Sequence, residues 1–360
     1  MESSFGALLP LLARERSAGR AVALAVMVHT VGSTYQRPGA LLLIAAGGEY
    51  AGLLSGGCLE GDLAEHARAV IESGQARRIT YDLRDPNDLI WGLGVGCEGA
   101  MHILLLRVGP AEHWQPLAHF ADAFAAHTTT AVGLVIDSHD TRIALGALVL
   151  PGDGATDTLT AAACTALEAS SRSGQPGWFE QPGRCRVFLL PLALPPRLLL
   201  LGAGPDASPV ARLAAQLHWK VTVVDHRPTL TQASRFTAAE RLIQARPETL
   251  LASVEVSGFQ AAVVMTHQLE VDREYLRALA QTALPYIGLL GPSARAARLL
   301  NELGADAANL RERLHAPVGL DLGGRSPEAI ALSIVAEILA FLHGHAPTVA
   351  PRGSASPRAT

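Results

Sequence analysis

Lysine is almost absent from this sequence, because Lys220 is the only lysine among 29 lysine and arginine residues. A Walker-type phosphate loop requires a lysine before serine or threonine, and Schiff-base catalysis requires a lysine amine. The composition therefore excludes the first and leaves little room for the second. Any phosphate that the chain binds must be held by backbone amides or by arginine.

Cysteine and charge are also sparse. The four cysteines form no CxxC pair and have no ligand spacing with histidine, which argues against a structural zinc site or a disulfide framework and fits a reducing compartment. Charged residues make up 17% with a net charge of -4, so there is no basic patch for nucleic acid. The apolar run over 21–28 is far shorter than the roughly 20 residues of a membrane helix. We expect a cytoplasmic protein that binds neither nucleic acid nor membrane.

The length indicates two domains. At roughly 150 residues per domain, 360 residues give two, and a hydrophobic content of 49% is enough for two cores. The proline-rich segment 191–196 interrupts regular structure and predicts a linker. We therefore expect an N-terminal domain over 1–190, a second domain over 197–344, and a disordered tail over 345–360, where Pro, Ser, Ala, Thr and Arg dominate.

The first domain shows a mixed pattern of helices and strands. Two apolar runs around Gly47-Gly48 predict a hairpin, and helical spacing follows over 59–72. Further strands are predicted over 78–83, 100–108, 131–136, 142–150 and 186–190, and further helices over 113–126 and 159–170. The pattern indicates an α/β domain.

The second domain alternates regularly between strand and helix. Its strands are near-continuous apolar runs, which is typical of a parallel sheet covered on both faces, as in Rossmann-like domains. The predicted strands are 197–201, 220–224, 241–244, 261–266 and 286–289, and the predicted helices are 207–217, 272–280, 293–303 and 326–342. The last helix has Ser326 as its N-cap and Pro327 in its first turn.

A GxGxxA turn joins the first strand and helix of this second domain. Gly202 permits the tight turn, Gly204 lets a pyrophosphate approach, and Asp225, at the end of the next strand, is placed to bind the ribose of NAD. The alternative is a Rossmann domain that has lost its dinucleotide and keeps the turn for packing. Asp206 argues against dinucleotide binding, because an acid at the helix start competes with phosphate for the same backbone amides.

Two glycine loops of the first domain each contain a cysteine. Cys58 follows Ser55-Gly56-Gly57 and precedes a helix, whose dipole and free amides lower a thiol pKa and attract an anion. Cys97 lies in the glycine loop 91–99. The alternative for both is a buried cysteine beside a tight backbone approach. Cys164 and Cys185 lie in ordinary packing segments.

Two further polar groups stand at chain turns. Ser33 and Arg37, in the loop 32–39, offer a hydroxyl and a guanidinium to an oxyanion. His267 follows the strand 261–266 and so falls at the carboxyl edge of the sheet, where ligands of open α/β folds bind. It is a candidate donor, acid or base, although a loop histidine is often a plain surface residue.

In combination these strings resemble the xanthine dehydrogenase accessory protein family, the XdhC/CoxI group. The most specific segment is SGGCLEGD over 55–62, and the glycine turn at 202 is the least specific. The resemblance spans most of residues 5–342, through segments 32–40, 54–62, 88–97, 201–204, 223–228, 266–267, 286–291 and 315–323.

This resemblance implies an α/β domain followed by a Rossmann domain, often in a homodimer. It implies a cytosolic factor that binds molybdenum cofactor, assists replacement of a molybdenum oxo ligand by sulfur, and delivers the product to an apo molybdenum hydroxylase such as xanthine dehydrogenase. A cysteine desulfurase is the other implied partner. The sequence departs from the family at Pro205-Asp206, where a His-Val-type pair is frequent, and in the segment 291–295, which is less basic than usual.

Applied to these residues, the resemblance leads to a hypothesis about the site. We expect Cys58, with Cys97 as second choice, to contact molybdenum or handle sulfur, because a soft thiolate suits that metal. Ser33, Arg37 and the loop residues Ser55, Gly56 and Gly57 are expected to hold the anionic cofactor.

Two other functions stay open. One is an NAD-dependent oxidoreductase that uses Gly202, Gly204 and Asp225 for the cofactor and His267 as proton carrier. The other is a scaffold paralogue that only docks partners.

Overall fold

The computed structural model describes residues 5–57, 59–84, 99–152 and 161–345. It divides into two compact units, Met1–Leu194 and Pro195–Thr360, which are called unit 1 and unit 2 below. Among the described residues, no helix is long and apolar enough to cross a membrane.

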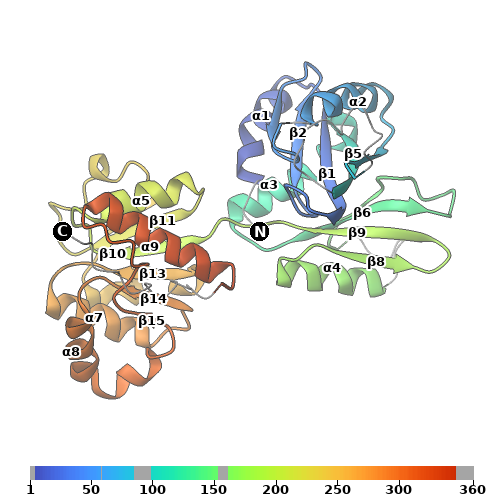
Figure 1. Cartoon of the computed structure of the whole chain (residues 1–360). Helices are drawn as coiled ribbons and strands as arrows, with labels where there is room; N and C mark the ends of the chain where they lie inside the picture. Colours follow the sequence, from blue (N-terminus) through green and yellow to red (C-terminus); the bar gives the residue numbers. More distant parts are fainter. Residues whose placement is uncertain (1–4, 58, 85–98, 153–160, 346–360) are drawn as a thin grey trace, which may run out of the picture. The chain divides into compact units, whose positions relative to one another are not determined.

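Unit 1 contains two antiparallel sheets, ordered β3-β2-β1-β5-β4 and β7-β6-β9-β8 (Figure 1). Its helices and strands are α1 (Phe5–Ser17), β1 (Val22–Gly32), β2 (Leu41–Ala45), β3 (Tyr50–Gly52), α2 (Glu60–Ser73), β4 (Arg77–Asp82), β5 (Gly99–Val108), α3 (Leu117–Ala126), β6 (Ala131–Ser138), β7 (Leu148–Val149), α4 (Ala161–Ser173), β8 (Gly177–Gln181) and β9 (Cys185–Pro191).

Alternation along β1 shows how unit 1 is layered. Val22, Leu24 and Val26 belong to a core shared with α1, α3 and the second sheet. Ala23 and Ala25 face the opposite side and pack with α2, because successive side chains of a strand point to opposite faces. The helix α4 covers the outer face of the second sheet.

Unit 2 is a six-stranded parallel sheet ordered β12-β11-β10-β13-β14-β15. Helices α5 and α9 pack on one face of it and α7 and α8 on the other, which confirms the predicted α/β class with a Rossmann-like parallel sheet. Its helices and strands are β10 (Arg197–Leu201), α5 (Ala207–Gln216), β11 (Lys220–Asp225), β12 (Arg241–Gln244), α6 (Leu250–Ser253), β13 (Ala261–Val264), α7 (Leu269–Ala280), β14 (Tyr286–Leu289), α8 (Ser293–Leu303), β15 (Leu314–His315) and α9 (Pro327–Leu342).

The strand order of unit 2 reverses direction between β10 and β13. The chain first builds outward through β11 and β12 and then returns to add β13 on the other side of β10. Such a reversal leaves a crevice at the carboxyl ends of the two central strands, which is where ligands of open α/β sheets bind.

The predicted strand over 142–150 is wrong except at its end, where β7 covers Leu148–Val149. The preceding residues form a turn held by Asp140, which accepts from the backbone N–H and the guanidinium of Arg142. Gly146 adopts a φ of +79° and its N–H bonds to the Val135 carbonyl at 2.7 Å. A run of apolar residues therefore does not by itself identify a strand. Here the turn buries an apolar side chain, Ile143, as a strand would.

Candidate functional site

The loop after β1 folds back onto the strand that it leaves. The Gly39 N–H donates to the Met27 carbonyl at 2.7 Å, and the Met27 N–H donates to the Ala40 carbonyl at 2.9 Å. The predicted residues Ser33 and Arg37 are both exposed on this loop. Within the described residues neither side chain has a hydrogen-bond or ion-pair partner.

Two glycines bring this loop against segments that are distant in sequence. A Cβ on Gly99, the first residue of β5, would collide with the Ser33 carbonyl oxygen. A Cβ on Gly56 would lie 3.5 Å from the ring of Tyr35. The loop after β1, the loop that contains Ser55, Gly56 and Gly57 (called the Ser55 loop below) and the start of β5 therefore meet at one end of the first sheet.

Glu60, the first residue of α2, holds the Ser55 loop together. Its side chain is only 1% exposed. Oε1 accepts from the backbone N–H groups of Leu54 at 3.1 Å and Ser55 at 2.9 Å. Oε2 accepts from the Ser55 hydroxyl at 2.5 Å and from the N–H groups of Gly57 at 3.1 Å and Leu59 at 3.2 Å.

These bonds stabilise the charged carboxylate. Burial alone raises the pKa of Glu60, but the Ser55 hydroxyl and the loop amides outweigh it and hold that pKa below its usual value. Two of the amides that the sequence offers to an external anion, those of Ser55 and Gly57, are thus bonded to Glu60. The Gly56 N–H has no partner within the described residues, and Gly56 and Gly57 are exposed with φ values of +76° and +106°.

The sequence pattern alone assigned Glu60 no role. Its signal was an acidic side chain in the first turn of a helix, three residues after Gly57, where a carboxylate closes back on the preceding amides.

The predicted thiols Cys58 and Cys97 lie outside the described residues. Cys185 is buried in β9, and that burial raises the pKa of its thiol. Cys164 is half-buried on α4. The burial of Cys185 agrees with its interpretation as a packing residue. Among the described residues, no group of three or more His, Cys, Asp or Glu side chains is placed to hold a metal ion.

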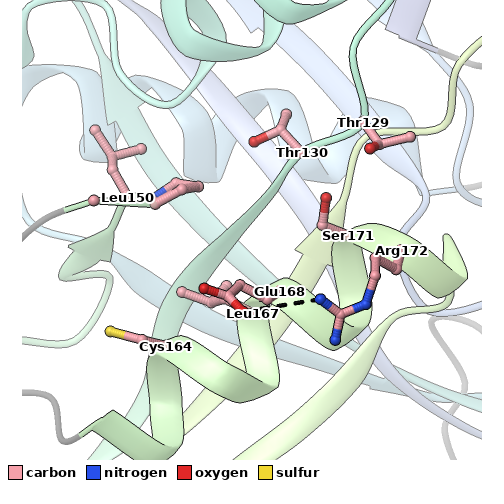
Figure 2. A pocket seen from close by; sticks show the side chains of 10 residues that line it. Thr129, Thr130, Leu150, Cys164, Leu167, Glu168, Ser171 and Arg172 are labelled. Carbon is pink, nitrogen blue, oxygen red and sulfur yellow. Dashed lines mark ion pairs between the residues drawn. The ribbon is translucent and has the colours of Figure 1, made fainter.

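A cavity of about 230 Å³ lies between α4 and the loops at the ends of β6 and β7 (Figure 2). The sulfur of Cys164 lies on its wall, and at its rim an ion pair of 3.8 Å joins Arg172 to Glu168. None of the sequence-predicted site residues lines it, so this cavity is separate from the loops that meet at β1 and β5.

In unit 2 the structure brings Gly202, Gly204 and His267 together at the crevice between β10 and β13. Gly202 has a φ of +124°, and a Cβ there would lie 2.7 Å from the Met265 carbonyl oxygen. At Gly204 a Cβ would meet only the His267 ring, at 3.7 Å. Packing therefore requires the first glycine, whereas a Cβ at the second one would make only an ordinary van der Waals contact.

His267 is itself engaged. Its backbone is left-handed, with a φ of +65°, and its Nε2 lies 3.0 Å from a carboxylate oxygen of Asp206 just before α5. An acid thus stands at the helix N-terminus that a pyrophosphate would use, paired with the histidine that sequence reasoning assigned to the ligand.

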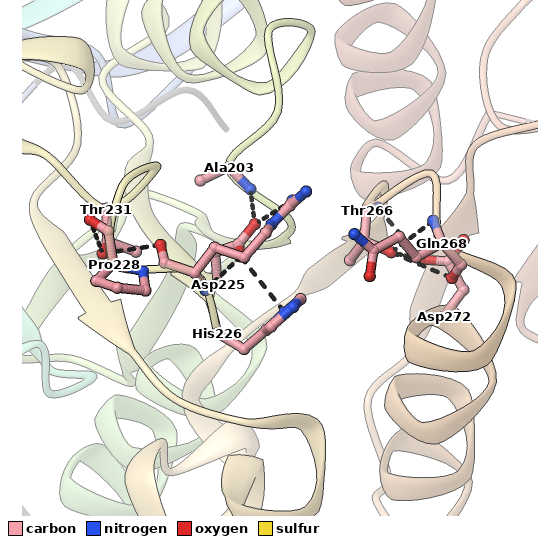
Figure 3. A network of polar contacts seen from close by, with 9 residues as sticks. Ala203, Asp225, His226, Pro228, Thr231, Thr266, Gln268 and Asp272 are labelled. Carbon is pink, nitrogen blue, oxygen red and sulfur yellow. Dashed lines mark hydrogen bonds and ion pairs between the residues drawn. The ribbon is translucent and has the colours of Figure 1, made fainter.

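Asp225 ends β11 and is fully buried (Figure 3). Oδ2 accepts from the Ala203 N–H at 2.7 Å and from the Arg227 guanidinium at 2.7 Å, and Oδ1 accepts from the Arg227 backbone and Nε at 2.9 Å each. Burial raises the pKa of Asp225, but these donors hold it below its usual value. Both carboxylate oxygens are therefore occupied, and the ribose acceptor that the sequence predicted is used within the chain.

A second buried acid closes the next loop. Asp272, in the first turn of α7, accepts from the Thr266 N–H at 3.2 Å and from the Thr266 hydroxyl at 2.5 Å (Figure 3). It also pairs with Arg295 of α8. Sequence reasoning did not single out this acid, although its place in the first turn of a helix that follows a strand was a visible signal.

Comparisons with known proteins agree on one family. Residues 198–338 match the model described as the XdhC Rossmann domain, and residues 15–82 match the model of the XdhC and CoxI family. A probable xanthine dehydrogenase subunit from Bacillus subtilis (strain 168) is 34% identical over 318 residues, covering 88% of this chain and 92% of that protein.

Two further relatives extend this likeness. The molybdenum cofactor insertion chaperone PaoD of Escherichia coli (strain K12) is 25% identical over 328 residues, covering 89% of this chain and 83% of its own. A crystal structure of a xanthine dehydrogenase from Bacillus halodurans superposes with a TM-score of 0.76 at 28% identity, covering 95% of this chain and 98% of that one.

Proposed function

The chain belongs to the XdhC and CoxI family, and from this premise we propose that it binds molybdenum cofactor and inserts it into an apo-hydroxylase of the xanthine dehydrogenase type. The cofactor is cargo here. When bound it supplies the molybdenum centre that the client enzyme uses, and this chain holds and releases it.

The observation that carries the proposal is that the loop after β1, the Ser55 loop and the start of β5 meet at one end of the first sheet of unit 1. One loop presents the exposed guanidinium of Arg37 and the hydroxyl of Ser33, which suit the phosphate of a pterin cofactor. The exposed Gly56 and Gly57 support it, because no Cβ keeps a ligand away from their backbone. The residues present therefore fit an anionic cargo.

Within this site the loop residues take different roles. Arg37, Ser33 and the Gly56 N–H are the proposed direct contacts, whereas Ser55 and Gly57 act through Glu60, which fixes their amides. Glu60 thereby also holds the chain on both sides of position 58. Cys58, and Cys97 as second choice, are proposed as the thiols that contact molybdenum or handle sulfur.

The proposal extends to sulfuration and to partners. A cysteine desulfurase would supply the sulfur that replaces a molybdenum oxo ligand, and the apo-hydroxylase would receive the product. We place this work in the cytoplasm, in a homodimer. Light scattering of the purified chain, alone and with each partner, tests the assembly, and a monomer at all concentrations would contradict it.

Two acidic residues at the crevice of unit 2 argue against the alternative, an NAD-dependent oxidoreductase. Asp225 is saturated by Ala203 and Arg227, and Asp206 stands where a pyrophosphate would lie. NAD binding would have to break these bonds. Calorimetric titration with NAD⁺ should therefore show no saturable binding up to about 1 mM NAD⁺, so the binding free energy should be weaker than about −4 kcal/mol. A Kd in the micromolar range would instead support the oxidoreductase.

The central test is cargo retention. The full chain, purified from cells that make molybdenum cofactor, should carry molybdenum, measured by mass spectrometry, and a pterin, measured by fluorescence after oxidation. Cys58→Ala and Arg37→Ala should lose most of both, together with activation of the apo-hydroxylase. Cys164→Ala is the matched control, because this cysteine lies on α4 away from the loops, and it should retain both.

Either of two results would overturn the proposal. One is a wild-type chain that carries neither molybdenum nor pterin when the cells contain both. The other is a Cys58→Ala, Arg37→Ala double variant that folds normally, retains the cargo and activates the hydroxylase as well as the wild type does.

A further inference from the structure

A cluster of aromatic and histidine rings lies where the two sheets of unit 1 meet. His29 of β1 and His102 of β5 are cross-strand partners, beside an irregularity in the register between Met27 and His29. Their ring centroids are 5.3 Å apart with an interplanar angle of 31°. Trp178 of β8, in the other sheet, meets His29 edge-on with centroids 5.6 Å apart. Side chains from both sheets thus form one surface, called the ring cluster below.

Trp178 is a large aromatic side chain that remains partly exposed. It is 41% exposed, although its cross-strand partner Phe188 is fully buried in the core between the sheets. The two rings pack edge to face at 5.5 Å, so Trp178 is held in a fixed orientation while much of its surface faces solvent. An exposed indole whose orientation is already fixed can stack on a flat ligand without a further loss of side-chain conformational entropy.

Two arginines border the ring cluster. The Arg186 guanidinium lies over the Trp178 ring, 5.8 Å from its centre, and 3.7 Å from the Glu180 carboxylate. Arg78 reaches across from β4 and donates to the Ile136 carbonyl at 3.3 Å. Burial, followed by the charges of His29 and Arg78, lowers the pKa of His102, whose Nδ1 lies 3.0 Å from the Thr80 hydroxyl. Positive charge at this border favours a ligand that carries negative charge.

The ring cluster is close to the loops of the proposed cargo site. The pairing of His29 with His102 continues along the same two strands to the pairing of Gly32 with Gly99. Three residues of strand correspond to about 10 Å. This is the reach of a ligand whose flat ring system and anionic group are joined by a short chain of atoms.

From this arrangement we propose that the ring cluster binds a planar heteroaromatic anion, with Trp178 as the stacking residue and His29 and His102 as its polar wall. The proposal deepens the proposed function and rests on it in one respect: the heteroaromatic group would be the pterin of the cargo, stacked here while its anionic end extends toward Arg37. Stacking on an aromatic side chain tolerates different ring substituents, which suits a protein that binds and then releases its ligand.

The test uses pterin-6-carboxylate as probe, with fluorescence anisotropy on the full-length chain purified free of cofactor. Trp178→Leu removes the flat ring but keeps an apolar side chain, and it should weaken probe binding roughly tenfold. Trp178→Phe keeps a ring and should stay within a few-fold of the wild type. Tyr50→Leu is the matched control, because Tyr50 is 45% exposed on β3 of the first sheet, near the start of β1 and away from His29.

The outcomes separate this inference from the proposed function. Equal probe affinity of Trp178→Leu and the wild type overturns the ring cluster as a stacking site, and so does a wild type that retains molybdenum but shows no saturable probe binding. A wild type that binds the probe through Trp178 yet never carries molybdenum supports the site and contradicts its assignment to this cargo. Thermal melting of each variant shows whether a loss of binding is a loss of fold.

Discussion

Replacement of Glu60 by glutamine tests whether one carboxylate organises the Ser55 loop. Oε1 accepts two backbone N–H groups, and Oε2 accepts two more together with the Ser55 hydroxyl. A glutamine side chain has one acceptor oxygen, and its NH₂ group must face N–H donors on the other side. The best orientation keeps the Oε2 partners and leaves the amides of Leu54 and Ser55 unpaired.

The magnitude follows from this count. Each hydrogen bond to a charged group contributes about 1.5–3 kcal/mol, so the loss of two predicts a decrease of about 3–6 kcal/mol in the free energy of unfolding, with the lower end favoured by relaxation of the loop. For a unit of 194 residues, 3 kcal/mol corresponds to a fall in Tm of about 6–12 °C.

Urea unfolding and scanning calorimetry measure this change. Glu65→Gln is the control, because Glu65 lies on the same helix but is exposed and should change stability by less than about 0.5 kcal/mol. A Glu60→Gln variant as stable as Glu65→Gln would refute the reasoning, because it would mean that the loop amides are satisfied equally well without the charge.

The same carboxylate predicts a dependence on pH. Its pKa is lower in the folded chain than the ordinary value of 4.5, so its contribution to stability is present above that value and is lost as the pH falls through the folded pKa. The stability difference between wild type and Glu60→Gln should therefore shrink below about pH 4.5. A constant difference from pH 7 to pH 3 would contradict the assignment.

Two further predictions concern unit 2. Gly202→Ala should lower the free energy of unfolding by about 3 kcal/mol, because it combines a positive φ with a clash against Met265. Gly204→Ala should lower it by less than about 1 kcal/mol. Equal urea midpoints for the two variants would contradict this prediction. Asp272→Asn should cost about 3 kcal/mol by leaving Arg295 without its buried partner, while the exposed Glu270→Gln of the same turn should be neutral by the same assay.

The sequence predicted unit 2 better than unit 1. Strands such as β12 and β14 have the predicted bounds, because each strand of a parallel sheet is a short apolar run between polar turns. The cap of α9 was also predicted, and the Ser326 hydroxyl accepts from Ala329 at 3.2 Å. In unit 1 the pairing of strands into two antiparallel sheets depends on contacts far apart in sequence, which local patterns do not encode.

The bonds within the candidate site were not predicted. Sequence motifs singled out the Ser55 loop and Arg37, and the structure brings the loop after β1, the Ser55 loop and the start of β5 together. The motifs did not predict that Glu60 and Asp225 would each turn their carboxylate inward and accept the amides of the neighbouring glycine turn. A sequence lists donors and acceptors, whereas only the fold decides which donor meets which acceptor.

The place of the single lysine has a practical consequence for partner mapping. Lys220 begins β11, its ammonium lies 3.0 Å from Glu240, and its side chain is largely covered. Amine-reactive crosslinkers would find almost no target on this surface. A stable complex with a client enzyme would therefore give almost no crosslinked product with these reagents. Reagents that couple carboxylates, which Asp and Glu supply at 33 positions, are the suitable choice for this chain.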